Sequence, residues 1–120
     1  FGGNALATAA ANATIRFMVA EDIPAHALKV GQYLWQKLEG LKTKFEGAIV
    51  AVRGRGLLLA LQFRDTISAT LVSTCNEKGL LLNPVRPDAI RFMPPLIITE
   101  AEVDEAITKL EAGLTEVLAK

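Results

Sequence analysis

The chain has 120 residues, about half of them apolar, and its 13 basic and 13 acidic residues give a formal net charge of zero. This length provides one domain with a modest core, and the charge balance provides no electrostatic basis for binding nucleic acid or an anionic membrane. No apolar run approaches the roughly 18 residues of a membrane-spanning helix.

The chain begins with Phe1-Gly2-Gly3 and not with Met, so we expect it to be part of a longer protein. Asn4 is placed to cap a helix that runs through the Ala-rich stretch to about Ala20. This helix is apolar nearly all round, which is typical of a helix covered on several sides. We expect part of it to face a domain or subunit outside this chain; a central core helix of this domain is the alternative. The predicted organisation is an N-terminal Ala-rich helix, residues 1–22, and a small α+β domain, residues 23–120.

A second helix is predicted from Ile23 to about Phe45, because apolar residues recur there at spacings of three and four. Pro24 suits its first turn, and Asp22 is expected to cap it. Tyr33 and Trp35 flank the apolar stripe, and we interpret both as packing residues.

Two strands are predicted at residues 48–52 and 57–63, where short apolar runs occur. The glycines of Arg53-Gly54-Arg55-Gly56 allow the positive φ of a tight connection, so the strands are expected to form an antiparallel hairpin. The two arginines of this segment are candidates for binding an anion, but a plain hairpin turn is favoured. Continuous apolarity of the strands predicts sheet faces that are largely covered.

In the second half of the chain, a helix is predicted to start at Asp65 or Thr66 and to end near Gly79. A short strand at residues 80–82 and a breaker-rich turn at residues 83–88 should follow. A strand containing Arg91 then ends at two prolines, and Thr99 and Glu102 form a capping box for the last helix. This order of elements predicts an α+β fold, a mainly antiparallel sheet of three or four strands with helices packed on one face.

Arg91 is the most informative residue of the chain. Strands alternate faces, so Ile90 and Phe92 should point to one side and Arg91 to the other. An unpaired charge on a half-buried surface is unfavourable, and the flat fork of a guanidinium suits a carboxylate held at two points. Two interpretations remain open at this stage. Arg91 binds a carboxylate ligand, or it has the commoner structural role, pairing with an acid of this chain or extending to water.

Other constellations are absent or weak. His26 is predicted to stand alone on a polar helix face, so there is no Ser-His-Asp set, and no glycine loop matches a nucleotide-binding fingerprint. Cys75 is interpreted as a small buried hydrophobe. One Cys and one His make neither an internal disulfide nor a zinc site, and the single cysteine fits a reducing, cytoplasmic setting. The acids of residues 100–105 are interpreted as a solvated first turn that complements the helix dipole.

Four stretches are informative when taken together: Phe1–Ala7, Val52–Leu57, Lys78–Pro84 and Ile90–Thr99. In combination, in this order and at this spacing, they resemble the C-terminal part of class III, pyridoxal-phosphate-dependent aminotransferases over essentially the whole chain. Within that class the third and fourth stretches are most similar to the acetylornithine aminotransferases. Ala5 departs from the proline that the family usually has after Asn4, and Arg86 falls in a loop that is often made of small residues.

The resemblance implies the small C-terminal domain of a fold-type I enzyme, normally a homodimer, that moves an amino group from N-acetylornithine to 2-oxoglutarate in arginine biosynthesis. It implies that Arg91 binds the substrate carboxylate and that Gly2, Gly3 and Asn4 lie next to the cofactor. It also places the Schiff-base lysine and most of the pyridoxal phosphate site before Phe1. We therefore expect no catalytic residue, no metal and no bound cofactor in this chain alone, which should be inactive.

The expected partners are a large pyridoxal-phosphate-binding domain, a second subunit, and small amino and keto acids, with neither nucleic acid nor membrane. Two alternatives stay open. The chain is a fragment of an ornithine- or 4-aminobutyrate-type class III aminotransferase, or it is a stand-alone α+β module that holds a small carboxylate at Arg91 without any reaction.

Overall fold

The computed structural model describes all 120 residues. The helices and strands follow the predicted order, and the α+β prediction is confirmed. None of the helices combines the length and the apolarity needed to cross a membrane. In chain order the elements are α1 Ala5–Ala20, α2 Ile23–Lys44, β1 Ile49–Arg55, β2 Leu58–Phe63, α3 Ser68–Glu77, β3 Asn83–Arg86, β4 Ala89–Phe92 and α4 Glu100–Leu118.

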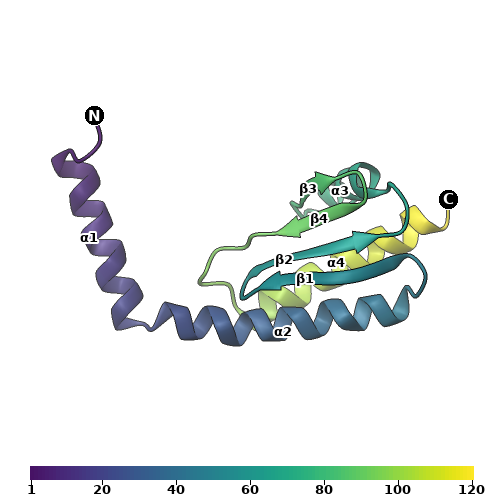
Figure 1. Cartoon of the computed structure of the whole chain (residues 1–120), viewed down its shortest axis with the longest axis horizontal. Helices are drawn as coiled ribbons and strands as arrows, with labels where there is room; N and C mark the ends of the chain where they lie inside the picture. Colours follow the sequence, from purple (N-terminus) through teal and green to yellow (C-terminus); the bar gives the residue numbers. More distant parts are fainter.

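The strands form one antiparallel sheet of four strands in the order β1-β2-β4-β3. Helices α2, α3 and α4 cover one of its faces, and in Figure 1 α4 passes behind β1 and β2. Alternate strand residues such as Leu61, Ile90 and Phe92 join these helices in a single core, where burial of apolar area stabilises the fold. The other face has no covering layer within the chain. The expectation that the faces would be largely covered is therefore wrong, and apolar strand residues such as Val50 and Leu58 are about half exposed.

Helix α1 extends away from the rest of the chain (Figure 1), and none of its 16 residues is buried. Its predicted cap is confirmed, because the Asn4 side chain accepts a hydrogen bond from the backbone N–H of Ala7 at 2.9 Å. The alternative of a central core helix is wrong, since Ile15 and Phe17 remain more than half exposed. The division between residues 1–22 and 23–120 stays a prediction.

Helix α2 begins at Ile23 with Pro24 in its first turn, as predicted. Asp22 takes a left-handed conformation with φ of 47° and its side chain makes no capping hydrogen bond, so its predicted capping role is wrong. An N-cap side chain needs an extended backbone to reach the first turn, and the sharp bend between α1 and α2 removes that geometry. Tyr33 and Trp35 pack against the core, as interpreted from the sequence.

The hairpin of β1 and β2 has a shorter connection than predicted. β1 continues through Arg55, which pairs with Leu58, so only Gly56 and Leu57 form the turn. Gly54 has φ of 124°, and a Cβ there would lie 2.0 Å from the carbonyl oxygen of Leu58. Glycine is therefore required inside this strand.

The edge strand β3 corrects two predictions, because residues 80–82 are not a strand and Asn83–Arg86 are. Pro84 suggested a turn, but an edge strand tolerates a proline whose missing N–H has no second neighbour to bond. The register also shifts between Pro84 and Arg86. Helix α3 starts at Ser68, later than expected, where the Ser68 hydroxyl donates to the carbonyl of Arg86 at 2.6 Å.

Strand β4 ends at Phe92, just before the two prolines, and the capping box of α4 is present, as predicted. The backbone N–H of Thr99 donates to Glu102 Oε2 at 2.9 Å, and the N–H of Glu102 donates to Thr99 Oγ1 at 3.2 Å. Asp104 is not merely solvated, since it accepts from the Tyr33 hydroxyl at 2.8 Å and pairs with Lys37 at 3.0 Å. These contacts connect α4 to α2.

The Asp104 contacts predict a specific pH dependence of stability. Tyr33 and Lys37 hold the pKa of the Asp104 carboxyl below its ordinary value. A carboxyl with a lowered folded pKa contributes stability above its unfolded pKa of about 4, and this contribution disappears as the pH falls through the folded value. We expect urea midpoints measured from about pH 5 down to about pH 3 to fall less steeply for Asp104→Asn than for the unchanged protein.

Glu100→Gln is the matched control for this experiment, because the Glu100 side chain lies at the start of the same helix and takes part in no hydrogen bond or ion pair. It should follow the unchanged protein. Parallel curves for Asp104→Asn and the unchanged protein would contradict the prediction.

Candidate functional site: an arginine in an apolar groove

Arg91 lies in the middle of β4, directly opposite Ala60 of β2 on one side and Asn83 of β3 on the other. Its neighbours Ile90 and Phe92 are buried towards the helices, while Arg91 is half-buried on the uncovered face. This is the alternation predicted from the sequence. The small side chain of Ala60 leaves room beside the guanidinium, and the amide of Asn83 gives it one polar neighbour.

The guanidinium of Arg91 has few partners. With the Asn83 amide in the orientation that satisfies its neighbours, its Oδ1 accepts a hydrogen bond from Arg91 Nη2 at 3.1 Å. Arg91 Nε is buried and has no partner. Arg91 takes part in none of the six ion pairs of the chain, so the alternative of a structural pair with one of the chain's own acids is wrong. A buried donor and an unpaired charge leave Arg91 able to bind an anion from outside the chain.

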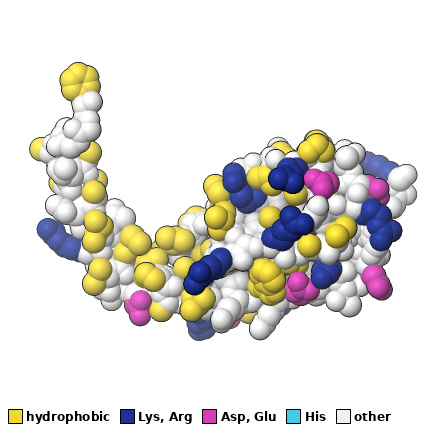
Figure 2. All heavy atoms as spheres, in the orientation of Figure 1, with side chains coloured by type: hydrophobic (Ala, Val, Ile, Leu, Met, Phe, Trp, Pro, Cys, Tyr) yellow, Lys and Arg dark blue, Asp and Glu magenta, His cyan; other side chains and the backbone are white.

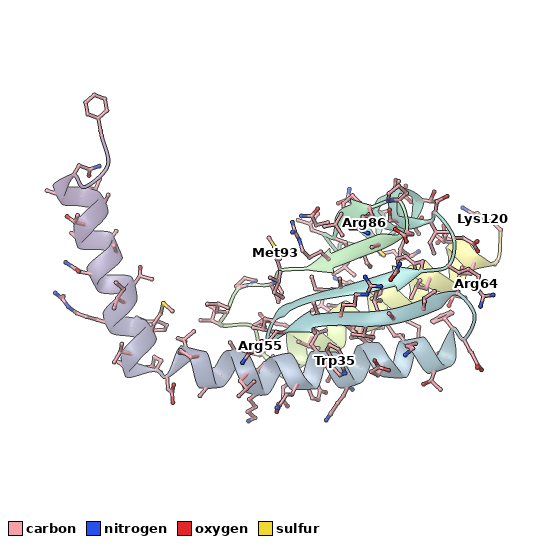
Figure 3. All side chains as sticks on the ribbon, viewed as in Figure 1. Trp35, Arg55, Arg64, Arg86, Met93 and Lys120 are labelled. Atoms are coloured by element: carbon pink, nitrogen blue, oxygen red, sulfur yellow. The ribbon has the colours of Figure 1, made fainter.

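Arg91 and Asn83 line a groove of about 510 Å³. Its walls are the segments that precede β3 and follow β4, together with residues of α2 and α4. Figure 3 shows Met93 beyond the end of β4, at the end of the sheet nearest α1. A largely apolar groove with one cationic group suits a ligand that has a carboxylate and an aliphatic part. The other lining residues are Leu34, Leu80, Leu81, Leu82, Phe92, Met93, Pro94, Pro95, Ile98, Val103, Ala106 and Ile107.

The two kinds of basic side chain are segregated. Every ion pair of the chain uses a lysine, and each of these lysines lies on α2 or α4 or just beyond the end of α3 or α4. Most arginines lie instead on the strands or their connections, and Figure 2 shows Lys and Arg side chains over the strands of the uncovered face. Arg53 donates to Gln62, which donates to Asp88 at 3.1 Å. The uncovered face thus has an excess of positive charge, which favours the approach of anionic ligands.

The structure does not bring the other predicted site residues next to Arg91. Gly2, Gly3 and Asn4 lie at the exposed N-terminal tip of α1, at the opposite end of that helix from the sheet (Figure 1). Their proximity to a cofactor stays a prediction. Arg86 is exposed on the edge strand, where its backbone carbonyl accepts from Ser68.

His26 is not on a solvated polar face as predicted. It is half-buried, and its Nε2 lies 2.8 Å from the carbonyl oxygen of Ile98. This contact joins α2 to the segment that follows β4. His26 and Ile98 are 72 residues apart in the sequence, so helical periodicity could not predict the contact. Cys75 is fully buried, as interpreted, and burial raises the pKa of its thiol, which opposes formation of a reactive thiolate.

Sequence reasoning missed Asn83 as a neighbour of Arg91. The segment 83–88 was predicted to be a turn, and a turn has no cross-strand partner for Arg91. The sequence did contain a signal of this pairing, because Asn83 precedes Arg91 by eight positions and a two-residue turn between them would place the two residues opposite each other. The observed pairing of Asn83 with Arg91 follows from that turn and the register shift beside Pro84.

No lysine of the chain lines the groove. Six of the seven lysines are paired with surface carboxylates, and the remaining one, Lys29, is exposed on α2. The residues present therefore do not fit a Schiff base with pyridoxal phosphate beside Arg91. No three His, Cys, Asp or Glu side chains come together in a way that would hold a metal ion.

Comparisons with known proteins identify the family. The chain is 41% identical over 111 residues to acetylornithine aminotransferase of Gloeobacter violaceus, covering 92% of this chain and 28% of that protein. It is 37% identical over 112 residues to ornithine aminotransferase 2 of Staphylococcus saprophyticus, covering 93% of this chain and 27% of that protein.

Comparison with solved structures indicates the same family. The solved structure of N-acetylornithine aminotransferase from Stenotrophomonas maltophilia matches with a TM-score of 0.90 and 30% identity, over 98% of this chain and 33% of that one. The chain therefore spans about a quarter to a third of the length of the relatives it matches. The α+β layer is the small-domain fold expected of fold-type I aminotransferases. The family model described as "Aminotransferase class-III" matches residues 1–114, and the chain belongs to that family.

Proposed function

We propose that this chain is the small C-terminal domain of a pyridoxal-phosphate-dependent enzyme that transfers an amino group from N-acetylornithine to 2-oxoglutarate, and that Arg91 binds the substrate carboxylate. The observation that supports this most is the state of Arg91. It is a half-buried cation with a buried, unpartnered Nε and no ion pair, at the side of an apolar groove. Both proposed substrates carry a carboxylate next to an aliphatic segment, which is the chemistry that this groove suits.

In this proposal the chain contributes substrate binding and no proton transfer. The guanidinium orients the substrate by holding its carboxylate at two points, and the apolar walls exclude water from it. Pyridoxal phosphate and the lysine that holds it would belong to the rest of the protein, so this chain alone would be inactive. We place the enzyme in the cytoplasm, in arginine biosynthesis.

The surfaces left uncovered support a role for partners. Helix α1 buries none of its residues although Leu6, Ile15 and Val19 are apolar, and one sheet face has no covering layer. Large exposed apolar surfaces are typical of interfaces. We propose that α1 and the uncovered sheet face contact the large pyridoxal-phosphate-binding domain and the second subunit of a homodimer.

A second candidate is an ornithine-type aminotransferase. The similarity to ornithine aminotransferase 2 of Staphylococcus saprophyticus, at 37% identity, favours it nearly as strongly as the acetylornithine relatives favour the first proposal. Both enzymes would use Arg91 in the same way, so the amino donor has to be identified by assay.

The test uses the full-length protein with 2-oxoglutarate and one of three donors: N-acetylornithine, ornithine or 4-aminobutyrate. We expect the highest kcat/KM with N-acetylornithine. Borohydride reduction followed by peptide mapping should place the cofactor adduct on a lysine outside residues 1–120. An adduct on one defined lysine of this chain would contradict the proposed division of roles.

The stand-alone carboxylate-binding module is tested by calorimetry. Titration of the isolated 120-residue chain with N-acetylornithine or 2-oxoglutarate should give no tight binding, because most of the proposed substrate contacts lie elsewhere. Tight binding by this chain alone would favour the module over the aminotransferase domain.

A further inference from the structure

Arg91 and Asn83 form a cross-strand pair whose geometry is set by the sheet. Their Cα atoms are register partners in the antiparallel ladder of β3 and β4, so both side chains project from the same face. The hydrogen bond of 3.1 Å from Arg91 Nη2 to Asn83 Oδ1 is the only one that the guanidinium makes within the chain. Both residues line the groove. Asn83 is therefore the one side chain of this domain that fixes the direction of the Arg91 guanidinium.

The chemistry of asparagine matters at this position. Its amide oxygen accepts a hydrogen bond from the guanidinium but carries no negative charge, so the full positive charge of Arg91 remains available to a ligand. An aspartate of the same shape would form a bidentate ion pair with Arg91 and compete with a substrate carboxylate. An alanine would leave the long arginine side chain free to adopt other rotamers.

Contacts between α3 and β3 hold Asn83 in place. β3 is an edge strand with one neighbour in the sheet, so it needs other contacts to hold its place. Ser68, at the start of α3, is 1% exposed and its hydroxyl donates to the Arg86 carbonyl at the end of β3. The backbone N–H of Ser68 donates to the carbonyl of Pro87 at 3.1 Å. Helix α3 thus fixes β3, and β3 presents Asn83 to Arg91.

We propose that Asn83 is a positioning residue, which holds the Arg91 guanidinium in the direction needed to receive the substrate carboxylate while leaving its charge unneutralised. This inference rests on the proposed function, in which Arg91 binds that carboxylate. Asn83 acts through Arg91, so its substitution should change the affinity for carboxylate substrates much more than the turnover number.

The experiment compares Asn83→Ala and Asn83→Asp in the full-length protein with its cofactor, measuring KM for 2-oxoglutarate, kcat and Tm. Asn83→Ala should raise KM about tenfold, the effect of losing one hydrogen bond to a charged group. Asn83→Asp should raise it further, on the order of a hundredfold, because the new carboxylate occupies the guanidinium. For both variants kcat and Tm should change little.

The relative KM values of Asn83→Ala and Asn83→Asp distinguish a positioning role from a packing role. Aspartate has nearly the shape of asparagine, so a role in packing alone predicts that Asn83→Asp resembles the unchanged protein and that Asn83→Ala lowers Tm. Val85→Ala is the matched control, because Val85 lies on the same edge strand with an exposed side chain that does not line the groove. Its KM should equal that of the unchanged protein.

Arg91→Ala, measured in the same assay, distinguishes the two proposals. If Arg91→Ala raises KM and both Asn83 variants match Val85→Ala, the positioning role is overturned and the proposed function stands. If Arg91→Ala leaves KM unchanged, the proposed function falls and the role of Asn83 falls with it. The positioning role is supported if Asn83→Ala raises KM, Asn83→Asp raises it further, and Tm stays unchanged in both variants.

Discussion

Replacement of Arg91 by alanine in the full-length protein is expected to raise the Michaelis constants of both carboxylate substrates by roughly 30- to 700-fold. This range corresponds to about 2–4 kcal/mol, the usual effect of removing one partner of a buried, charged hydrogen-bonded pair. The effect should be this large because no other side chain of the domain offers a cation inside the groove. Steady-state kinetics with N-acetylornithine and 2-oxoglutarate, each varied in turn, measure it.

Two further variants control for charge and for geometry. Arg64→Ala removes the same formal charge just after β2, where the side chain is exposed and makes no ion pair, so its KM values should change little. Arg91→Lys keeps the charge but loses the planar fork, and it should give an intermediate loss. Equal constants for Arg91→Ala and Arg64→Ala would remove the assigned role of Arg91.

Replacement of Gly31 by alanine is expected to destabilise the fold by about 1–3 kcal/mol. Gly31 is buried in α2, and a Cβ on it would lie 2.4 Å from the carbonyl carbon and oxygen of Gly56 in the hairpin turn. Helix and turn meet backbone to backbone at this point, so no flexible side chain is available to move aside. Either α2 or the hairpin must shift, and the core residues between them lose contacts.

Gly40 provides a matched control on the same helix, because a Cβ there meets nothing within 4 Å. Gly40→Ala should stabilise the chain by about 0.5–1 kcal/mol, since alanine has the higher helix propensity. Denaturant unfolding of the two variants should therefore show changes of opposite sign. Changes of the same sign in the free energy of unfolding of Gly31→Ala and Gly40→Ala would contradict this prediction.

Local patterns predicted most of the fold. The 3.6-residue repeat of α2, the cap of α1 at Asn4, the capping box at Thr99 and the stop at Pro94 all depend on neighbours within a few residues, and all are confirmed. The alternation of Ile90, Arg91 and Phe92 about β4 is equally local, and it put the arginine on the correct face.

Features that depend on distant contacts were less accessible. The sequence around Pro84 is typical of a turn, and Pro84 can belong to a strand only because β3 lies at the edge of the sheet. The partners of His26 and Asp104 lie about 70 residues away, at separations of 72 and 71 residues, and no periodicity reveals them. The orientation of Asp22 follows from the bend that sends α1 away from the domain.

The segregation of lysine from arginine has a practical consequence for handling this domain. All seven lysines lie on helices or at a helix end, and none lies on a strand. Amine-reactive dyes, cross-linkers and sensor-chip chemistry will therefore attach through the helices, and the sheet face with Arg91 will remain unmodified and turned outward.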